Sequence, residues 1–253
     1  MALTSSRAAF FDVDNTLVRG STLYFLGKGM YQRGFFTKAD ISRFVVANIR
    51  FRMTGTEKQD VIEKFQNAAT DFIGGHAVDE IKKIGEEIYD EYVSPKLWNG
   101  TCEIARAHLD KGEEVWLVTA APQDMANIIS QRLGFTGALG SKAHIENGIY
   151  TGTLDGKLLH GVEKAIAIQD LAQQRGFNLQ DCAAYSDSHN DIPLLQAVGH
   201  PSAINPDAVL RIRALAEGWP IQDFRRARFL NRLLGPTVSR LAAAATWLTP
   251  RKR

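Results

Sequence analysis

The sequence contains little of what defines several classes of protein. Only two cysteines occur among its 253 residues, without a CxxC pair or a histidine at ligand spacing, so neither a disulfide framework nor a zinc site is predicted. Proline and glycine are too sparse for a collagen-like or low-complexity chain. The longest apolar run near the C-terminus, 241–248, is far shorter than the roughly 20 residues of a membrane-spanning helix.

The N-terminal segment also lacks the apolar stretch of a secretory leader, because Asp12 interrupts it. We therefore expect a cytoplasmic protein whose two thiols are reduced and buried. Hydrophobic residues make up 45% of the chain and charged residues 23%, as in ordinary globular proteins. The length allows one large domain or two smaller ones.

Short apolar runs alternate with helical patterns over most of the chain, which predicts an α/β fold with a doubly wound, Rossmann-like parallel sheet. Apolar runs predict strands, and a hairpin is expected to turn at Asn147-Gly148. The expected strands are 7–13, 114–120 and 182–187, and the expected helices are 99–111, 122–133, 162–175 and 192–197.

Residues 21–92 differ from this pattern because their apolar positions, such as Ile81, Ile84 and Ile88, recur at helical spacing. They predict a helical insertion directly after the first strand. We therefore expect three parts: an α/β core formed by 1–18 and 93–220, a helical cap at 19–92, and a basic C-terminal tail at 221–253.

Polar side chains gather where the predicted strands end. Such residues often cap helices or turns, but here several fall at the carboxyl ends of one sheet, where α/β proteins bind ligands. A cluster of carboxylates requires a cation, and oxygen ligands with a lysine nearby suit Mg²⁺ and phosphoryl transfer. The residues are Asp12, Asp14, Asp187, Asp191, Thr119 and Lys164.

These motifs resemble those of the haloacid-dehalogenase-like phosphatases. DVDNT (12–16) is similar to that family's nucleophile motif, and SDSHND (186–191) is similar to its closing acidic motif. Between them, Thr119 in LVTAA matches the family's strand-end hydroxyl residue, and Lys164 matches its lysine. The inserted helices resemble the cap of the phosphoserine-phosphatase-like branch. The order and spacing of the motifs fit along residues 8–207.

The resemblance implies a role for each residue. Asp12 would be the nucleophile that forms an aspartyl-phosphate, and Asp14 the general acid and base. Mg²⁺ would be held by Asp12, Asp187 and the backbone carbonyl of Asp14, with Asp191 as outer support. The phosphoryl group would be bound by Thr119 and Lys164, with Asn190 beside it.

The substrate is less well specified by the motifs. Phosphoserine-specific members carry a glutamate nine residues after the nucleophile, where this sequence has Ser21. They also have two glycines after the strand-end hydroxyl, where this sequence has Ala120 and Ala121. The expected reaction is hydrolysis of a small phosphomonoester, phosphoserine by family default. Phosphoryl transfer to another acceptor is an open alternative, as is a non-catalytic binding protein.

The charge of the C-terminal segment suggests a further alternative. Residues 221–253 carry eight basic and one acidic side chain, whereas the first 220 residues carry 22 basic and 27 acidic ones. A helix over 222–234 would place Arg225, Arg228 and Arg232 on one side. Such a segment either packs on the protein or binds an anionic membrane from the cytoplasmic side, which would favour a lipid phosphate as substrate. Nucleic-acid binding is not expected, and the sequence specifies no oligomeric state.

Overall fold

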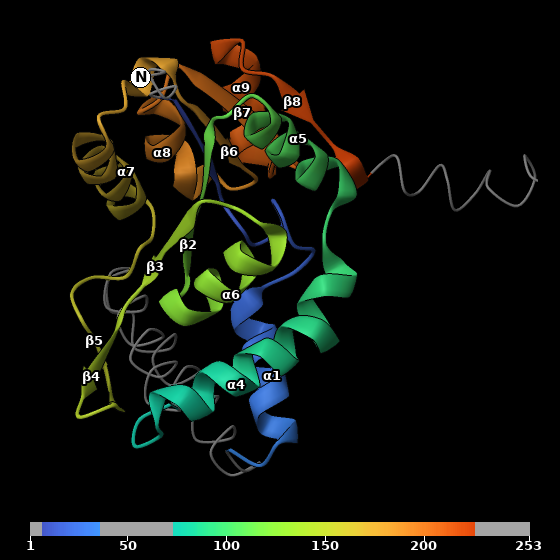
Figure 1. Ribbon diagram of the computed structural model, residues 1–253. Helices are drawn as coiled ribbons and strands as arrows, with labels where there is room; N and C mark the ends of the chain where they lie inside the picture. Colours follow the sequence, from blue (N-terminus) through green and yellow to red (C-terminus); the bar gives the residue numbers. More distant parts are fainter. Residues whose placement is uncertain (1–6, 36–72, 226–253) are drawn as a thin grey trace, which may run out of the picture.

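Six parallel strands form the central sheet of the computed structural model, which describes residues 7–35 and 73–225 (Figure 1). Their order is β3-β2-β1-β6-β7-β8, so the chain extends from β1 to one side and then to the other. This arrangement confirms the expected doubly wound sheet. The strands are β1 (Ala8–Phe11), β2 (Glu114–Pro122), β3 (Gly137–Ser141), β6 (Ala183–Ser186), β7 (His200–Ile204) and β8 (Ile221–Gln222).

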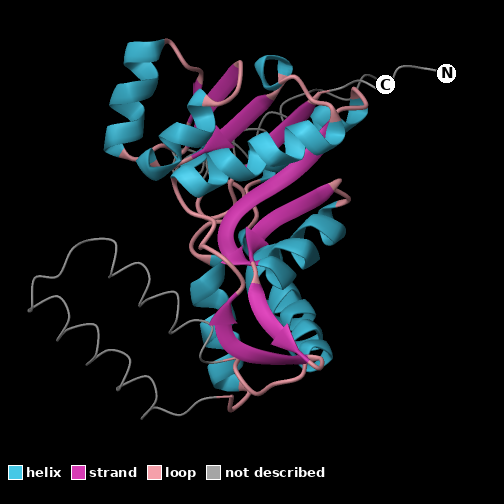
Figure 2. Ribbon diagram, turned by 90° about the vertical axis from the view of Figure 1, so that its left-hand side faces the viewer, coloured by secondary structure: helices cyan, strands magenta, loops and turns pink. Residues whose placement is uncertain are grey.

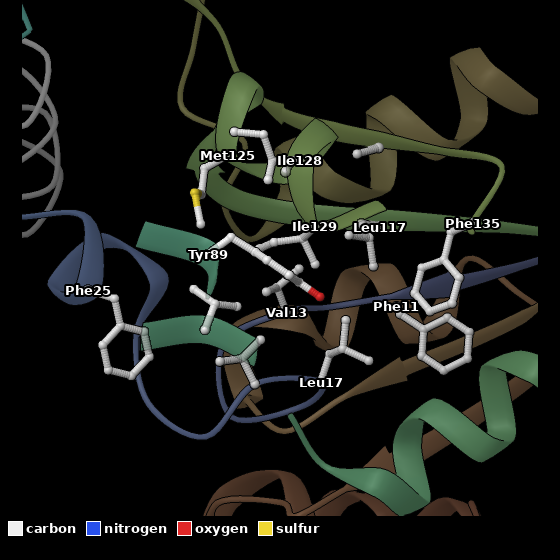
Figure 3. Packing of buried hydrophobic residues seen from close by; sticks show 14 of the residues in the cluster. Phe11, Val13, Leu17, Phe25, Tyr89, Leu117, Met125, Ile128, Ile129 and Phe135 are labelled. Atoms are coloured by element: carbon white, nitrogen blue, oxygen red, sulfur yellow. The ribbon is translucent and has the colours of Figure 1, made fainter. Parts of the chain in front are cut away.

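Helices cover both faces of the sheet because both faces of its central strand are apolar. Ala9 and Phe11 of β1 pack in one cluster with α5 (Asn99–Asp110) and α6 (Gln123–Leu133). Ala8 and Phe10 pack in a second cluster with α7 (Val162–Arg175), α8 (Ile192–Gln196) and α9 (Ala208–Glu217). Figure 3 shows the first cluster, in which the rings of Phe11 and Phe135 stack. Burial on both faces is typical of parallel sheets.

Most expected elements are present, and their boundaries differ by a few residues. The strand expected at 114–120 continues to Pro122 as β2. The expected hairpin is formed by β4 (Ala143–Glu146) and β5 (Ile149–Leu154). It turns at Asn147 and Gly148, whose φ angles are 52° and 79°. Two successive positive φ angles are what a tight hairpin turn requires, so the Asn-Gly signal predicted this turn correctly.

The C-terminal part of the sheet differs from the expectation. Gln222 was expected to begin a helix, but it lies in β8, where its carbonyl accepts a hydrogen bond of 2.8 Å from the Asn205 amide. The start of the helix that was predicted from the periodicity of the basic segment is therefore wrong. The remainder of the expected helix and tail, 226–253, lies outside the described residues.

Two helices of the inserted segment lie at one end of the sheet (Figures 1 and 2). They are α1 (Thr22–Gln32) and α4 (Val78–Ile88), and α4 continues into short turns at Tyr89–Val93 and Ser94–Lys96. The two connections to the sheet domain are paired with each other: the Arg19 amide donates to the Lys96 carbonyl, and the Trp98 amide to the Leu17 carbonyl, each at 2.8 Å. Residues 7–35 and 73–225 include no helix with the length and apolarity to span a membrane.

The helices of the insertion also contact the sheet domain and the hairpin. Gly85 of α4 lies so close to α6 that a Cβ there would be 2.7 Å from the Ile128 side chain. The Val78 amide donates to the Gly148 carbonyl in the hairpin turn at 3.0 Å. The hairpin, which the sequence placed with the core, therefore lies against the start of α4.

Candidate active site

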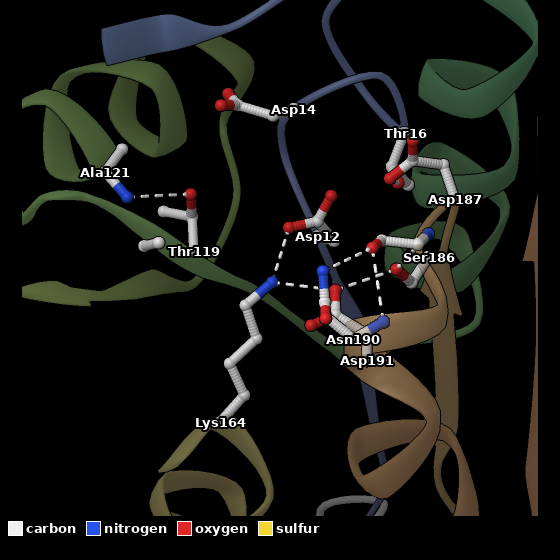
Figure 4. Close-up of polar contacts among 12 residues, drawn as sticks. Asp12, Asp14, Thr16, Thr119, Ala121, Lys164, Ser186, Asp187, Asn190 and Asp191 are labelled. Carbon is white, nitrogen blue, oxygen red and sulfur yellow. Dashed lines mark hydrogen bonds and ion pairs between the residues drawn. The ribbon is translucent and has the colours of Figure 1, made fainter. Parts of the chain in front are cut away.

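The polar residues singled out in the sequence lie at the carboxyl ends of the three central strands (Figure 4). Asp12 and Asp14 follow β1, Thr119 lies near the end of β2, and Asp187 follows β6. Lys164 is in the first turn of α7. This edge is where the strand order reverses, so the loops diverge there and leave space for a ligand.

Lys164 joins two of the carboxylates through its ammonium group. Its Nζ donates to Asp12 Oδ1 at 2.6 Å and to Asp191 Oδ2 at 2.8 Å. The same oxygen of Asp191 accepts a hydrogen bond of 2.7 Å from the Ser186 hydroxyl. Asp12, Lys164 and Asp191 are at most 5% exposed. Buried charges are tolerated only when they are paired, and Lys164 is the cation that both carboxylates share.

The electrostatics of the cluster show an excess of negative charge. Burial raises the pKa of Asp12 to about 7, an effect that Lys164 opposes and Asp191 and Asp14 reinforce. Burial also raises the pKa of Asp187 to about 8, and the charges of Asp12 and Asp191 add to this rise. Burial alone would lower the pKa of Lys164, but Asp12 and Asp191 outweigh it and raise this pKa above its ordinary value. Lys164 is therefore a cation, but its one charge does not balance the carboxylates.

A divalent cation fits this imbalance. In the described part of the chain no three His, Cys, Asp or Glu side chains converge as ligands, so a cation here would need a backbone ligand as well. The Asp14 carbonyl, with the Asp12 and Asp187 carboxylates, would form a set of hard oxygen ligands that suits Mg²⁺. Asp187 is oriented by Thr16, whose hydroxyl donates to Asp187 Oδ1 at 3.4 Å. Asp191 pairs with Lys164 and is not counted among the direct ligands. It would support them from the second coordination shell, through Lys164.

The side chain of Asp14 points away from Asp12 and toward the inserted helices (Figure 4). Its Oδ1 accepts two hydrogen bonds from Thr22, one from the amide at 2.9 Å and one from the hydroxyl at 2.6 Å. Thr22 is the first residue of α1 and is fully buried. The N-terminus of a helix favours a carboxylate, so α1 holds Asp14 in place.

Thr119 and Asn190 differ in how closely they join the cluster. Thr119 is 2% exposed, and its Oγ1 accepts a hydrogen bond of 3.1 Å from the Ala121 amide, which leaves the hydroxyl hydrogen to be donated to a ligand. Asn190 is exposed in the turn His189–Asp191, and its side-chain amide donates to Ser188 Oγ at 3.2 Å. The structure therefore brings Thr119 into the site and leaves Asn190 at its rim.

Sequence reasoning missed three residues of this site. Thr16 and Ser186 lie inside the DVDNT and SDSHND motifs, so their positions were a signal that they orient neighbouring carboxylates. Thr22 follows Ser21, whose hydroxyl accepts from the Tyr24 amide at 3.5 Å as the N-cap of α1. A Ser-Thr pair before an apolar helix is a capping signal, and it could have indicated where α1 begins.

Comparisons with known sequences agree with the motifs. The family described as haloacid dehalogenase-like hydrolase matches residues 9–196. The chain is 47% identical over 246 residues to a putative hydrolase of Mycobacterium leprae, covering 97% of this chain and 82% of the relative. It is 48% identical over 237 residues to phosphoserine phosphatase SerB1 of Mycobacterium tuberculosis, covering 94% and 77%. A histidinol-phosphatase of Neisseria meningitidis is 26% identical over 221 residues, covering 86% and 98%.

Solved structures share the fold. A protein of unknown function from Bordetella pertussis has a TM-score of 0.76 at 26% identity, covering 86% of this chain and 98% of its own. An apo phosphoserine phosphatase has a TM-score of 0.59 at 19% identity, covering 89% and 97%. The family match and the identities to the mycobacterial relatives place the chain among the haloacid dehalogenase-like hydrolases, as a phosphatase-type enzyme that hydrolyses phosphoric monoesters.

Proposed function

We propose that this enzyme hydrolyses a small, amine-bearing phosphomonoester, with phosphoserine as the first candidate, through an aspartyl-phosphate on Asp12. The observation that carries the proposal is the contact between Lys164 and Asp12. The lysine bonds Oδ1, and the other carboxylate oxygen of Asp12 points away from it (Figure 4). That oxygen is the atom that would attack phosphorus.

The attack brings a carboxylate toward a phosphate dianion. Two like unit charges about 4 Å apart repel by roughly 4 kcal/mol at an effective dielectric constant near 20. Lys164 offsets this repulsion from one side, and the Thr119 hydroxyl can donate to a phosphoryl oxygen. Bound Mg²⁺, held by Asp12, Asp187 and the Asp14 carbonyl, would supply further positive charge against the phosphoryl oxygens.

Asp14 would handle the proton. Because Oδ1 already accepts two hydrogen bonds from Thr22, we assign the transferable proton to Oδ2. Asp14 donates this proton to the leaving alcohol oxygen as the bond from phosphorus to that oxygen breaks. It then accepts a proton from the water that attacks the phosphorus of the aspartyl-phosphate and restores Asp12.

The substrate proposal rests on the relatives. The names of two of them refer to phosphoserine and to histidinol phosphate, each a phosphomonoester that carries an amine. Ser21, at the position where phosphoserine-specific members have a glutamate, uses its hydroxyl to cap α1. We infer that Ser21 does not bind the amine of the substrate and that an acidic residue elsewhere in the chain would do so.

The test is Mg²⁺-dependent phosphate release from a panel of phosphoserine, histidinol phosphate, amine-free small phosphomonoesters and a lipid phosphate, with Asp12→Asn as the blank. Preference for the two amines supports the proposal. Preference for the lipid phosphate would shift the substrate to the membrane alternative. Activity that persists in Asp12→Asn would overturn the mechanism. If the wild type releases no phosphate from any compound of the panel, phosphoryl transfer to another acceptor or a non-catalytic binding function would be favoured.

A further inference from the structure

Asn205 connects two distant parts of the chain at the edge of the site. It follows β7, is 1% exposed and has a φ of 49°. Its Nδ2 donates to the Asn15 carbonyl at 3.0 Å, and its Oδ1 accepts from the Phe224 amide at 2.8 Å. Asparagine tolerates this left-handed backbone better than most residues do, so the position suits its backbone as well as its amide.

The orientation of the Asn205 amide is fixed by its two partners. A backbone N–H can only donate, so the atom that faces Phe224 must be Oδ1. A carbonyl can only accept, so the atom that faces Asn15 must be Nδ2. The C-terminal segment 221–225 therefore turns the NH₂ group of Asn205 toward the loop that follows Asp12.

The C-terminal segment is itself anchored. The Phe224 ring lies so close to α5 that a Cβ on Gly100 would be 2.3 Å from it. Arg225 donates to the Pro206 carbonyl at 3.0 Å and to Asp223 at 2.9 Å. The partner of Asn205 Oδ1 is therefore held in place by contacts on both sides.

The contact with Asn15 fixes a peptide unit that leads to the proposed metal ligands. Asn15 has a φ of 60° and directly follows Asp14. The next residue, Thr16, donates its hydroxyl to Asp187 Oδ1. Its carbonyl accepts a buried hydrogen bond of 2.8 Å from the Thr101 hydroxyl. Rotation of the Asn15–Thr16 peptide would alter the backbone torsions on either side of it. The orientation of the preceding Asp14 carbonyl and the position of the Thr16 hydroxyl would change as a result.

We propose that Asn205 is a positioning residue for the loop 12–16: through the Asn15 carbonyl it sets the Asp14 carbonyl and the Thr16–Asp187 contact, and so the geometry of the cation site. The inference rests on the proposed function. It also assigns the C-terminal segment 221–225 a part in the site, because that segment orients the Asn205 amide.

The test compares two variants that both permit the left-handed backbone. Asn205→Gly removes both side-chain hydrogen bonds, and Asn205→Asp keeps an acceptor for Phe224 but loses the donor to Asn15. Ser202→Ala is the matched control, because Ser202 lies in β7, the strand that Asn205 follows. Its hydroxyl donates to the Pro220 carbonyl at 3.3 Å and makes no hydrogen bond to loop 12–16 among the described residues. Measurements are kcat, KM, the half-activating Mg²⁺ concentration, and the rise in unfolding temperature on adding Mg²⁺.

We expect both Asn205 variants to need several-fold more Mg²⁺ and to lose about tenfold in kcat, which corresponds to about 1.4 kcal/mol, with KM nearly unchanged. Their unfolding temperature should rise less with Mg²⁺ than that of the wild type, whereas Ser202→Ala should behave as the wild type. A wild-type Mg²⁺ response in Asn205→Gly would overturn the inference even if Asn205→Asp fails to fold. An inactive wild type would count against the proposed function, and its Mg²⁺-induced temperature rise would still test the role of Asn205.

Discussion

At the scale of single residues, the site is a cluster of carboxylates around one lysine. Asp187 contacts Thr16 but has no bond to Lys164, and burial with its acidic neighbours raises its pKa to about 8. Asp12 and Asp191 share the lysine. The sequence predicted which side chains meet here, because strand ends of a parallel sheet converge. The family resemblance set Lys164 against the charge of Asp12, but it did not predict that Lys164 would also bond Asp191.

The raised pKa of Asp187 predicts a pH-dependent response to Mg²⁺. Between pH of about 4 and 8 the native protein without metal holds a proton that the unfolded chain releases, so its free energy of unfolding falls as pH rises. Mg²⁺ should displace that proton and therefore raise the unfolding temperature more at pH near 8 than near 5.5. Thermal unfolding with and without Mg²⁺ measures this. Asp187→Asn should reduce the difference without removing it, because the pKa of Asp12 is also raised, to about 7; equal shifts at both pH values in the wild type would contradict this prediction.

Replacement of Lys164 should affect stability as well as activity. Lys164→Met keeps the length of the side chain but leaves Asp12 and Asp191 buried without a cation, so we expect a loss of about 3–5 kcal/mol near pH 8. The loss should be smaller near pH 5.5, where Asp12, whose pKa burial raises to about 7, can be protonated. Urea unfolding at both pH values measures it. Lys157→Met removes an exposed ion pair with Glu163 and should cost less than about 1 kcal/mol. Similar losses of unfolding free energy in the two variants would show that Lys164 is not the cation that compensates Asp12 and Asp191.

At the scale of elements, α1 links the inserted helices to Asp14. Its first residue, Thr22, supplies both hydrogen bonds to Asp14 Oδ1, and this link was not predicted from the sequence. The apolar strands β1, β2 and β6 were predicted because they are buried on both faces. The strands β7 and β8 were missed because β8 has only two residues and β7 begins with His200-Pro201.

The contact of α1 with Asp14 can be tested with two neighbouring residues. Thr22→Val removes the hydroxyl but keeps the shape of the side chain, so kcat should fall by about tenfold, the equivalent of one hydrogen bond to a charged group. Ser21→Ala removes the N-cap of α1 and should cost about 1 kcal/mol of stability with kcat nearly unchanged. Steady-state kinetics and thermal unfolding separate the two effects. If kcat falls for Ser21→Ala and not for Thr22→Val, the role given to Thr22 is wrong and Ser21 acts on the substrate instead.

At the scale of the whole molecule, the contacts that assemble the site within 7–35 and 73–225 join residues from Asp12 to Arg225. The C-terminal segment reaches the site through the Phe224 amide, the Asn205 side chain and the Asn15 carbonyl. No sequence pattern indicated this link, because its three members lie far apart in the chain. The parts of the expected cap at 36–72 and of the expected tail at 226–253 lie outside the described residues.

Deletion of 226–253 should therefore leave hydrolysis of water-soluble phosphomonoesters at the wild-type rate. Deletion from Pro220 onward should reduce it, because β8 and the Phe224–Asn205 bond are lost. Phosphate release by the two truncated chains measures this. Co-sedimentation of the full and shorter chains with anionic vesicles tests the membrane alternative, which requires binding that depends on 226–253. Loss of soluble activity in the shorter deletion would contradict the assignment of the site.

The central claim is that Asp12 carries the phosphoryl group during turnover. The most direct measurement is rapid acid quenching of the Asp14→Asn variant with substrate and Mg²⁺, followed by mass spectrometry to locate the phosphate on the chain. We expect a phosphoryl group on Asp12, because loss of the Asp14 base slows hydrolysis of the intermediate more than it slows formation of the intermediate from a substrate with a good leaving group. Phosphate on any other residue, or turnover by the wild type without a phosphorylated Asp12 in any quenched sample, would contradict it.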